Sequence, residues 1–308
     1  MKTLKFSAVL ILVFSLAIVG CKKNPDPEIT DTSSLEALSQ DENLIVQSSD
    51  GIMNDVCSIL SESNFKSTNW WIPPCNSTLD SVVVLNDTAT FYVTYDGLNC
   101  AGTKVRTGNV EIRKPVDVNW YEAGATVSVK IINFTITKVG TQRTVTLNGT
   151  RFLENESGGI IWQIGNGVEY VVHRATGSMD AVFGNGTSRT WSFARQKLFT
   201  GAPSEFVITV SGFGSANGYE NLTVWGTNRN GEDFYTQIIQ AVEYKQLCDW
   251  DPVSGIRVHQ IPGDNNKSAT ITFGYDSNNQ PVSGDDCPTK FKLDWERNGN
   301  SGTIYLFL

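Results

Sequence analysis

The sequence predicts an all-β fold, either an antiparallel β-sandwich or a curled meander sheet, with one short N-terminal amphipathic helix. From about residue 70 to residue 308, short segments of alternating apolar and polar residues are separated by turns rich in glycine and asparagine. This is the pattern of strands in an antiparallel sheet. Apolar residues at helical spacing occur near residues 49–62. Hydrophobic residues make up 40% of the 308-residue chain, enough for a sizeable core.

The predicted helix covers about residues 49–62, and Ser48, Ser49 or Asp50 can cap its start. Residues three and four positions apart lie on one face of a helix. The apolar residues at this spacing are Ile52, Met53, Val56, Cys57 and Leu60. We therefore expect this face to pack against the sheet.

The strand region contains one long alternating segment, TVSVKIINFTITKV at 126–139, and several hairpins. Gly-Asn-Gly triplets at 165–167 and 184–186 and Asn-Gly pairs at 217–218 and 230–231 mark turns. Because the predicted short strands follow one another with no helical pattern between them, the sheet is expected to be antiparallel.

The N-terminus has the pattern of a lipoprotein signal. Lys2 and Lys5 precede an uncharged, largely apolar run at 6–20, which is shorter than the about 20 residues of a membrane span. The run ends in Ile18-Val19-Gly20-Cys21, which is similar to a bacterial lipobox. This similarity implies cleavage before Cys21 and attachment of diacylglycerol to its sulfur. The alternative is a simple secretory signal with a chance cysteine.

The expected organisation is a signal peptide at 1–20, a lipid-anchored flexible tether at 21–41 and a β-rich domain at 42–308. A tether of about 20 residues has a root-mean-square reach of about 25 Å. Without the signal peptide, 22 basic and 32 acidic residues give a net charge of −10. That charge disfavours nucleic acid as a partner. The expected partners are the membrane, through the covalent lipid, and a glycan or an envelope protein; no cofactor is expected.

Four of the six cysteines are arranged around an internal similarity. The segments at 88–96 and 268–276 match in register, and each has one cysteine before it and one after it. The economical pairing is Cys75–Cys100 and Cys248–Cys287. Spacing alone does not prove this connectivity.

Residues suited to nucleophilic or zinc chemistry are few. Cys57 lies on the apolar side of the predicted helix, in an acidic segment without histidine, so a buried free thiol is expected there. The two histidines, His173 and His259, are far apart in strand-like segments, and no paired-His or CxxC spacing indicates a metal site. No G-x-S-x-G motif is present. We therefore expect no catalytic constellation and no metal site of the zinc type.

Acidic loops provide weaker candidates. The clusters are Glu232 and Asp233, Asp249 and Asp251, and Asp276, Asp285 and Asp286. Two carboxylates about 5–10 Å apart are the machinery of a glycoside hydrolase. Oxygen ligands for calcium are offered by Asp276, Asn278, Asn279 and Asp285, without EF-hand spacing. Acids in loops are far commoner than acids in catalysis, so these clusters predict neither activity on their own.

Tryptophans offer a weak glycan-binding candidate. Trp70 and Trp71 are adjacent, but neighbouring side chains of an extended segment point to opposite faces, so the pair does not form one stacking platform. The remaining tryptophans are expected to fill the core. They are Trp120, Trp162, Trp191, Trp225, Trp250 and Trp295.

Four stretches together resemble a group of uncharacterised Bacteroidetes lipoproteins without an assigned activity. They are YDGLNCAGTKVRTGNVEI, RTWSFARQKLF, VWGTNRNGEDF and LCDWDPVSGIRVHQI, followed by the hairpin from SATITFGYD to DDCPTKFKLDW. The resemblance covers most of residues 75–308. It implies the β-rich fold and an outer-membrane location, on the periplasmic or the cell-surface leaflet. Asp80-Ser81-Val82 and Asp87-Thr88-Ala89 are similar to the O-glycosylation triplet of that phylum, with Ser81 and Thr88 as acceptors.

These observations favour a non-enzymatic, outer-membrane-anchored β-domain with a binding or structural role in the cell envelope. One alternative is a glycan-binding module of an uptake system, which the tryptophan content and the extracytoplasmic location favour. A second alternative is a glycoside hydrolase built on the acidic clusters.

Overall fold

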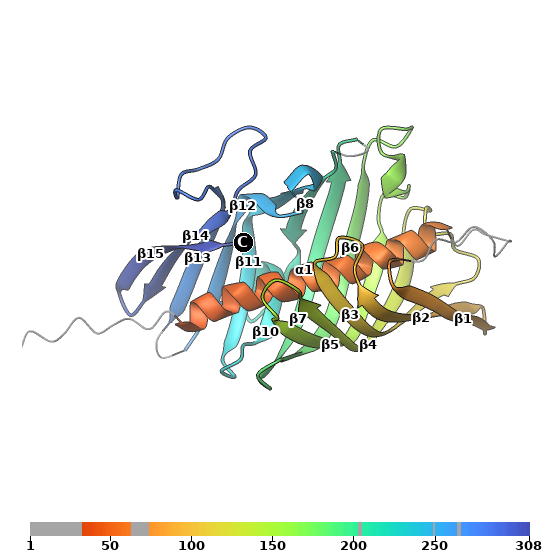
Figure 1. The fold of residues 1–308 in the computed structure, drawn as a ribbon, viewed down its shortest axis with the longest axis horizontal. Helices are drawn as coiled ribbons and strands as arrows, with labels where there is room; N and C mark the ends of the chain where they lie inside the picture. Colours follow the sequence, from red (N-terminus) through yellow and green to blue (C-terminus); the bar gives the residue numbers. More distant parts are fainter. Residues whose placement is uncertain (1–32, 63–73, 203–204, 249, 264–265) are drawn as a thin grey trace, which may run out of the picture. The chain divides into compact units, whose positions relative to one another are not determined.

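In the computed structural model, one long helix lies along the concave side of a single antiparallel sheet (Figure 1). The structure describes residues 33–62, 74–202, 205–248, 250–263 and 266–308. The helix α1 covers Ser33–Glu62, and two short 3-10 helices cover Ile161–Gln163 and Gln246–Cys248. The strands are β1 Ser77–Leu85, β2 Thr88–Leu98, β3 Lys104–Pro115, β4 Ala125–Lys138, β5 Thr144–Asn155, β6 Val171–Phe183, β7 Ser188–Thr200, β8 Val207–Gly212, β9 Gly214–Ala216, β10 Tyr219–Thr227, β11 Asp233–Lys245, β12 Pro252–Ile261, β13 Lys267–Tyr275, β14 Lys290–Arg297 and β15 Asn300–Phe307.

The all-β prediction is confirmed, and of the two predicted architectures the curled meander is the one observed. The strand order runs from β1 to β7 and then from β10 to β15, with each strand paired antiparallel to its neighbour. β8 and β10 share the position between β7 and β11. β10 pairs with one end of both strands and β8 with the other end.

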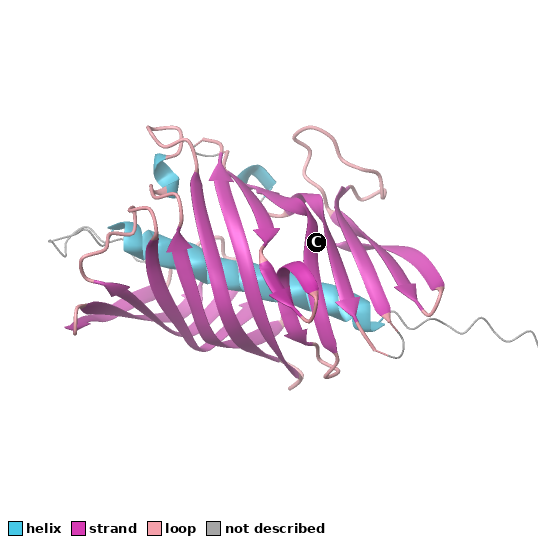
Figure 2. Ribbon diagram, turned by 180° about the vertical axis from the view of Figure 1, so that it is seen from behind, coloured by secondary structure: helices cyan, strands magenta, loops and turns pink. Residues whose placement is uncertain are grey.

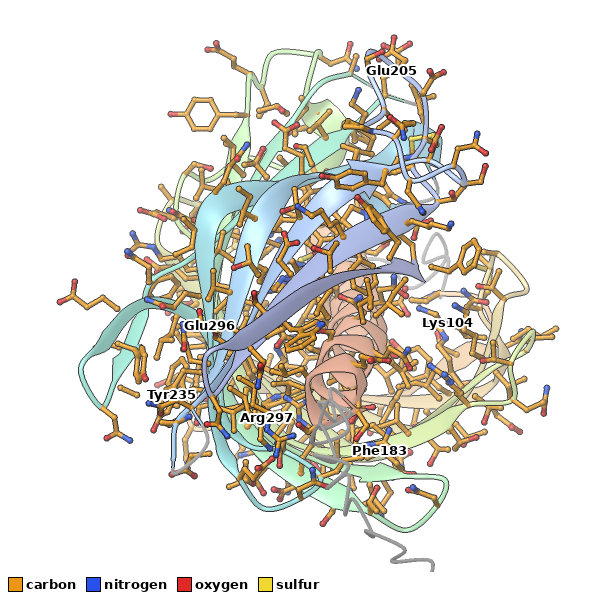
Figure 3. All side chains as sticks on the ribbon, turned by 90° about the vertical axis from the view of Figure 1, so that its left-hand side faces the viewer. Lys104, Phe183, Glu205, Tyr235, Glu296 and Arg297 are labelled. Atoms are coloured by element: carbon orange, nitrogen blue, oxygen red, sulfur yellow. A yellow bond between two sulfur atoms is a disulfide. The ribbon has the colours of Figure 1, made fainter. Side chains whose placement is uncertain are left out.

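The strands bend around the helix (Figures 2 and 3). Glycines where two strands approach closely allow this bend. Gly149 in β5 and Gly177 in β6 have φ angles of 151° and 148°. A Cβ atom on Gly149 would lie 2.3 Å from the carbonyl oxygen of Ser178, and one on Gly177 would lie 2.2 Å from that of Thr150. Because glycine has no side chain, the two strands can approach closely and curve at these positions, where any other residue would clash.

The core lies between α1 and the concave face. Alternating residues of each strand point inward, as Val127, Val129 and Ile131 do in β4. The helix residues buried against them include Leu35, Leu38, Ile45, Ile52, Val56, Ile59 and Leu60. Burying each such side chain contributes about 1.5–3 kcal/mol to folding.

The helix was predicted too short. It ends near the expected position, but it begins at Ser33, so residues 33–41 are helical rather than part of a tether. Leu35 and Leu38 are buried in this first part. The polar residues that made the segment look solvent-exposed include Asp41, which the sheet covers. The physical reason is that its basic partner comes from a distant loop, as described below.

The disulfide prediction is confirmed. Cys75 is bonded to Cys100 and Cys248 to Cys287, while Cys57 is a buried free cysteine. Of the tryptophans expected in the core, Trp120 and Trp191 are buried, but Trp162 and Trp250 are exposed.

The remaining N-terminal predictions lie outside the described residues. They concern the signal peptide, Cys21, the tether up to residue 32, Trp70 and Trp71. None of the described helical segments has the length and apolar character that a bilayer crossing requires.

Candidate functional site

The concave face meets α1 through buried ion pairs as well as apolar contacts. Four acids of the helix bind basic side chains contributed by β3, β7, β12 and the β10–β11 turn. The pairs are Asp41 with Arg229, Glu42 with Arg257, Asp50 with Arg195 and Lys197, and Asp55 with Arg106. The acidic side chains of α1 are therefore paired with basic side chains of the sheet and of the β10–β11 turn.

The Asp50 cluster is the most strongly charged of these contacts. Its carboxylate lies 2.9 Å from Lys197 Nζ and 3.2 Å from Arg195 Nη1. Burial would raise the pKa of Asp50, but Arg195 and Lys197 hold it well below its ordinary value. Asp50 is consequently ionised at neutral pH and cannot act there as a general acid.

A cavity of about 330 Å³ lies beside this cluster at the middle of α1. The helix contributes Val46, Gln47, Asp50, Gly51 and Asn54 to its wall. The remaining wall comes from two parts of the sheet that are distant in sequence. One is the region of the β2–β3 turn and the end of β4, and the other comprises β7, β8, β11 and the segment before β12. The curl of the sheet brings them together.

Lys104 and Lys138 both belong to the first part of the wall, and Figure 3 marks the position of Lys104. They are opposite each other in the register of β3 and β4. Like charges placed directly across two strands destabilise a sheet. Burial and then the charge of Lys138 lower the pKa of Lys104. Within the described chain neither ammonium forms an ion pair; the carboxylates of Asp50 and Asp251 act on Lys104 at longer range.

A bulge turns Lys138 toward the cavity. The register of β4 shifts at Asn133, which has a φ of 46°, and the side-chain oxygen of Asn148 accepts a hydrogen bond of 2.7 Å from its backbone N–H. Before the bulge the odd-numbered residues of β4 are buried, and after it the even-numbered ones are, such as Ile136. Lys138 therefore faces inward, whereas Lys130 is exposed.

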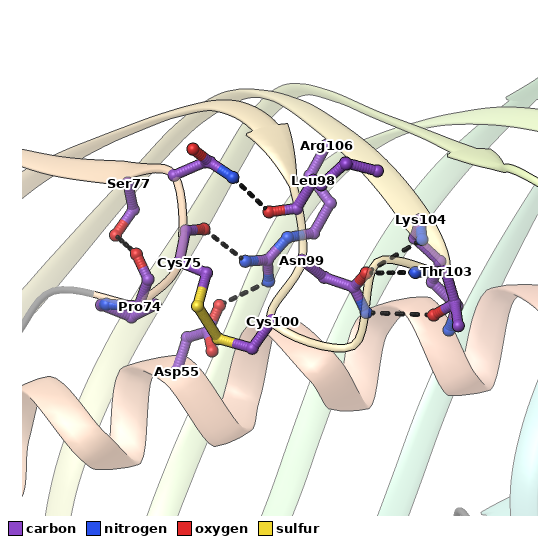
Figure 4. Close-up of a disulfide and its surroundings, with 11 residues drawn as sticks. Asp55, Pro74, Cys75, Ser77, Leu98, Asn99, Cys100, Thr103, Lys104 and Arg106 are labelled. Carbon is purple, nitrogen blue, oxygen red and sulfur yellow. Dashed lines mark hydrogen bonds and ion pairs between the residues drawn. A yellow bond between two sulfur atoms is a disulfide. The ribbon is translucent and has the colours of Figure 1, made fainter.

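The turn that carries Lys104 is organised by Asn99 (Figure 4). The Asn99 side-chain oxygen accepts hydrogen bonds of 2.9 Å from the backbone N–H groups of Thr103 and Lys104. Its side-chain nitrogen donates to the Thr103 hydroxyl at 3.2 Å. Next to Asn99, the Cys75–Cys100 disulfide fixes the turn to the start of β1. The lysine is thus presented by a rigid loop.

The second part of the wall is largely apolar and aromatic. Ile208, Val210 and Tyr244 are buried, while Trp250 is 36% exposed. Trp250 has a φ of 63°, and its backbone N–H donates to the carbonyl of Lys245 at 3.1 Å. The lining therefore combines aromatic rings, amides and ammonium groups, the composition of a site for a polar small molecule.

Cys57 has the environment of an inert thiol. Burial raises its pKa to about 12 and lowers the pKa of His173 to about 3, and the Cys57 Sγ lies 3.8 Å from His173 Nδ1. A neutral thiol beside a neutral imidazole is not an activated nucleophile. His259 is buried as well, and burial lowers its pKa to about 4.

The calcium candidates bind protein donors. Asp276 Oδ1 accepts hydrogen bonds of 2.8 Å from the backbone N–H groups of Asn278 and Gln280, which closes a turn. Lys290 donates to Asn279 at 2.9 Å, and Lys245 lies 3.2 Å from Asp285. Among the described residues, no group of three or more His, Cys, Asp or Glu side chains is arranged to hold a metal ion.

The acidic clusters are not gathered into one site. Glu232 pairs with Lys267 at 2.6 Å, Asp233 is exposed at the start of β11, and Asp251 lines the cavity. Asp249 lies outside the described residues, and Asp286 is exposed. Of the described acids of these clusters, Asp251 lies in the cavity wall, whereas Glu232, Asp233 and Asp286 do not.

The two glycosylation candidates lie in the first hairpin. Ser81 is exposed on β1. Thr88 is half-buried at the start of β2, and its hydroxyl donates to the carbonyl of Asn86 at 3.4 Å. The exposure of Ser81 leaves its hydroxyl open to solvent.

Sequence reasoning missed the residues that define the cavity. Lys104, Lys138 and Lys197 belong to three strands, and no short motif links them. Trp250 was assigned to the core although it follows Cys248 in a loop, and this position was the one available signal of exposure.

Comparisons with known proteins add no relative. No family model, no curated protein and no solved structure matches this chain. The function is therefore argued from the cavity itself.

Proposed function

We propose that this chain is an outer-membrane lipoprotein whose β-domain binds a small polar ligand in the cavity beside α1. The observation that carries the proposal is the cavity of about 330 Å³, because its size is in the range of small-molecule sites. Its wall combines aromatic side chains with amides and hydroxyls, such as Tyr244, Asn99 and Thr103.

Binding is a better description than hydrolysis. Of the two carboxylates in the wall, Asp50 and Asp251, Asp50 is ionised and paired with two cations. It therefore lacks the proton that a general acid must supply to a leaving group. The aromatic and amide lining favours a glycan among polar ligands, because sugar rings present apolar faces to aromatic rings and hydroxyls to amides.

Gly51 provides the test. A Cβ atom added to this helical glycine meets nothing within 4 Å, and the residue lines the cavity. Gly51→Trp should therefore fill the cavity without disturbing α1, while Gly51→Ala should leave most of it open. The full lipidated chain, purified in detergent, would be applied to an array of neutral and acidic oligosaccharides. We expect binding by the wild type and Gly51→Ala, and loss of binding in Gly51→Trp.

The result that would overturn the proposal is equal signal from Gly51→Trp and Gly51→Ala, since the ligand would then lie elsewhere. Absence of any hit on the array would count against the glycan. Thermal melts of both variants would show that the fold is retained.

The membrane anchor is tested separately. Cys21→Ser should move the protein from the membrane fraction to the soluble fraction, because it removes the site of diacylglycerol attachment. Mass spectrometry of the wild type should find the acylated Cys21 at the N-terminus. An unmodified Cys21 in the membrane-extracted protein would refute the lipoprotein assignment.

A further inference from the structure

The cavity carries an excess of positive charge. Three cations line its wall, Lys104, Lys138 and Lys197, against two carboxylates, Asp50 and Asp251. Beneath the wall, Arg195 also pairs with Asp50, so the Asp50 carboxylate is already matched twice. Together the four cations and two carboxylates leave a net charge of about two positive charges at the site.

The position of this excess is set by the backbone. Lys104 and Lys138 are register partners on β3 and β4. The turn organised by Asn99 positions Lys104, and the β-bulge at Asn133 orients Lys138. Since neither ammonium has an ion-pair partner in the described chain, the arrangement costs stability in the empty protein. An anion bound between the two ammonium groups would remove that cost.

We propose that Lys104 and Lys138 bind the carboxylate of an acidic sugar in this cavity. The inference rests on the proposed function and names the ligand class. The rest of the wall matches the body of such a ligand: Tyr244 and Trp250 provide aromatic surface, and Gln47 and Asn54 are amides within the same wall. A carboxylate between two ammonium groups forms charge-assisted hydrogen bonds, which are among the stronger polar contacts in proteins.

The charge of the whole chain limits the size of this anion. Without the signal peptide, the chain carries a net charge of −10, so its field repels long polyanions such as nucleic acid. A short ligand with one or two carboxylates enters a local positive site at little cost, because charges more than about 8–10 Å away are screened at physiological ionic strength. The site therefore fits a uronic-acid sugar of one or two rings.

Titration calorimetry of the full chain in detergent tests the inference with three probes. They are a digalacturonate, the matching neutral digalactoside and benzoate as a carboxylate without a sugar. We expect the digalacturonate to bind, the neutral disaccharide to bind about 10- to 100-fold more weakly, and benzoate to bind weakly or not at all. Affinity for the digalacturonate should fall as salt is added.

Two variants and a matched control assign the effect to the lysines. Lys104→Met and Lys138→Met should each weaken digalacturonate binding about 10-fold or more while leaving neutral disaccharide binding unchanged. Lys130→Met is the control, because Lys130 is on the same strand as Lys138 but on the outer face. It should bind like the wild type.

The outcomes separate this inference from the proposed function. Equal binding of the acidic and neutral disaccharides, unaffected by either lysine variant but lost in Gly51→Trp, overturns the carboxylate site and leaves the cavity as a neutral-glycan site. If benzoate binds as strongly as digalacturonate and its binding depends on the lysines, the assignment of a sugar as the ligand is overturned. No digalacturonate binding at all overturns the inference outright.

Discussion

Glu42 allows the buried charge between α1 and the sheet to be tested quantitatively. Its side chain is 1% exposed and lies 3.2 Å from the guanidinium of Arg257, which is 4% exposed. The hydroxyl of Thr236 donates a hydrogen bond of 2.7 Å to the carboxylate, and His259 Nδ1 lies 3.6 Å from it. Glu42→Gln keeps the shape and removes the charge, which leaves Arg257 buried without its ionic partner.

The expected cost follows from that geometry. Removing one partner of a buried ion pair typically destabilises a protein by about 3–5 kcal/mol, because the remaining charge stays desolvated. Burial would raise the pKa of Glu42, but the charge of His259 where that ring is protonated, the charge of Arg257 and the hydrogen bond from the Thr236 hydroxyl hold it below its ordinary value. At pH 7, where His259 is neutral, Arg257 and Thr236 keep the carboxylate ionised. We therefore expect Glu42→Gln to lower the free energy of unfolding by about 3 kcal/mol.

Urea unfolding at pH 7, followed by tryptophan fluorescence, measures this change from the midpoint and slope. Asp285→Asn is the control, since the Asp285 side chain is 90% exposed in its pair with Lys245 and should have no measurable effect. The double variant Glu42→Leu/Arg257→Met removes both charges and should recover part of the lost stability. A change of less than about 1 kcal/mol in Glu42→Gln would refute the reasoning.

Further predictions concern pH, the thiol, one disulfide and the helix. Burial lowers the pKa of His259 to about 4, below its unfolded value near 6.5, so the unfolded chain takes up the proton first and this residue should contribute roughly 3 kcal/mol to the loss of stability between pH 6.5 and pH 4. His173, whose pKa burial lowers to about 3, adds a loss of its own, so the total loss should be smaller in His259→Gln but not abolished. Cys57 should react with iodoacetamide only in denaturant, and labelling of the native protein would contradict its burial. Replacing Cys248 and Cys287 by serine opens a 39-residue separation and should cost about 4 kcal/mol in urea unfolding; an unchanged midpoint would count against it. Gly51→Ala should raise the free energy of unfolding by up to about 1 kcal/mol, because alanine favours a helix more than glycine does and the added Cβ atom has no neighbour within 4 Å. A lower urea midpoint in this variant would disprove the prediction.

The helix start shows where local patterning is insufficient. The sequence predicts the apolar stripe around Ile52 and Val56 because those residues recur at helical spacing. It does not predict that Asp41 and Glu42 are buried, since acids that lack a visible partner look like solvated residues. Their partners are far away in the chain: Arg229 follows Asp41 by 188 residues, and Arg257 follows Glu42 by 215 residues.

The cavity shows the same limit for function. By the two-residue period of a strand, Lys138 belongs on the outer face with Lys130. One extra residue in β4, at Asn133, reverses that assignment and turns Lys138 toward Lys104. A bulge depends on the register with the neighbouring strands, which the pattern of a single strand does not contain.

The sequence by itself determined the fold class, and it favoured the disulfide pairing and the free thiol that the structure then showed. Each of these depends on short-range patterns, namely strand alternation, turn residues and the repeated segments that flank the four paired cysteines. Only the tertiary structure decided how far the sheet curls, where α1 begins and which lysines share a cavity. These features arise from contacts between residues far apart in the chain, and a local pattern carries no information about the partner that will neutralise, bury or expose a side chain.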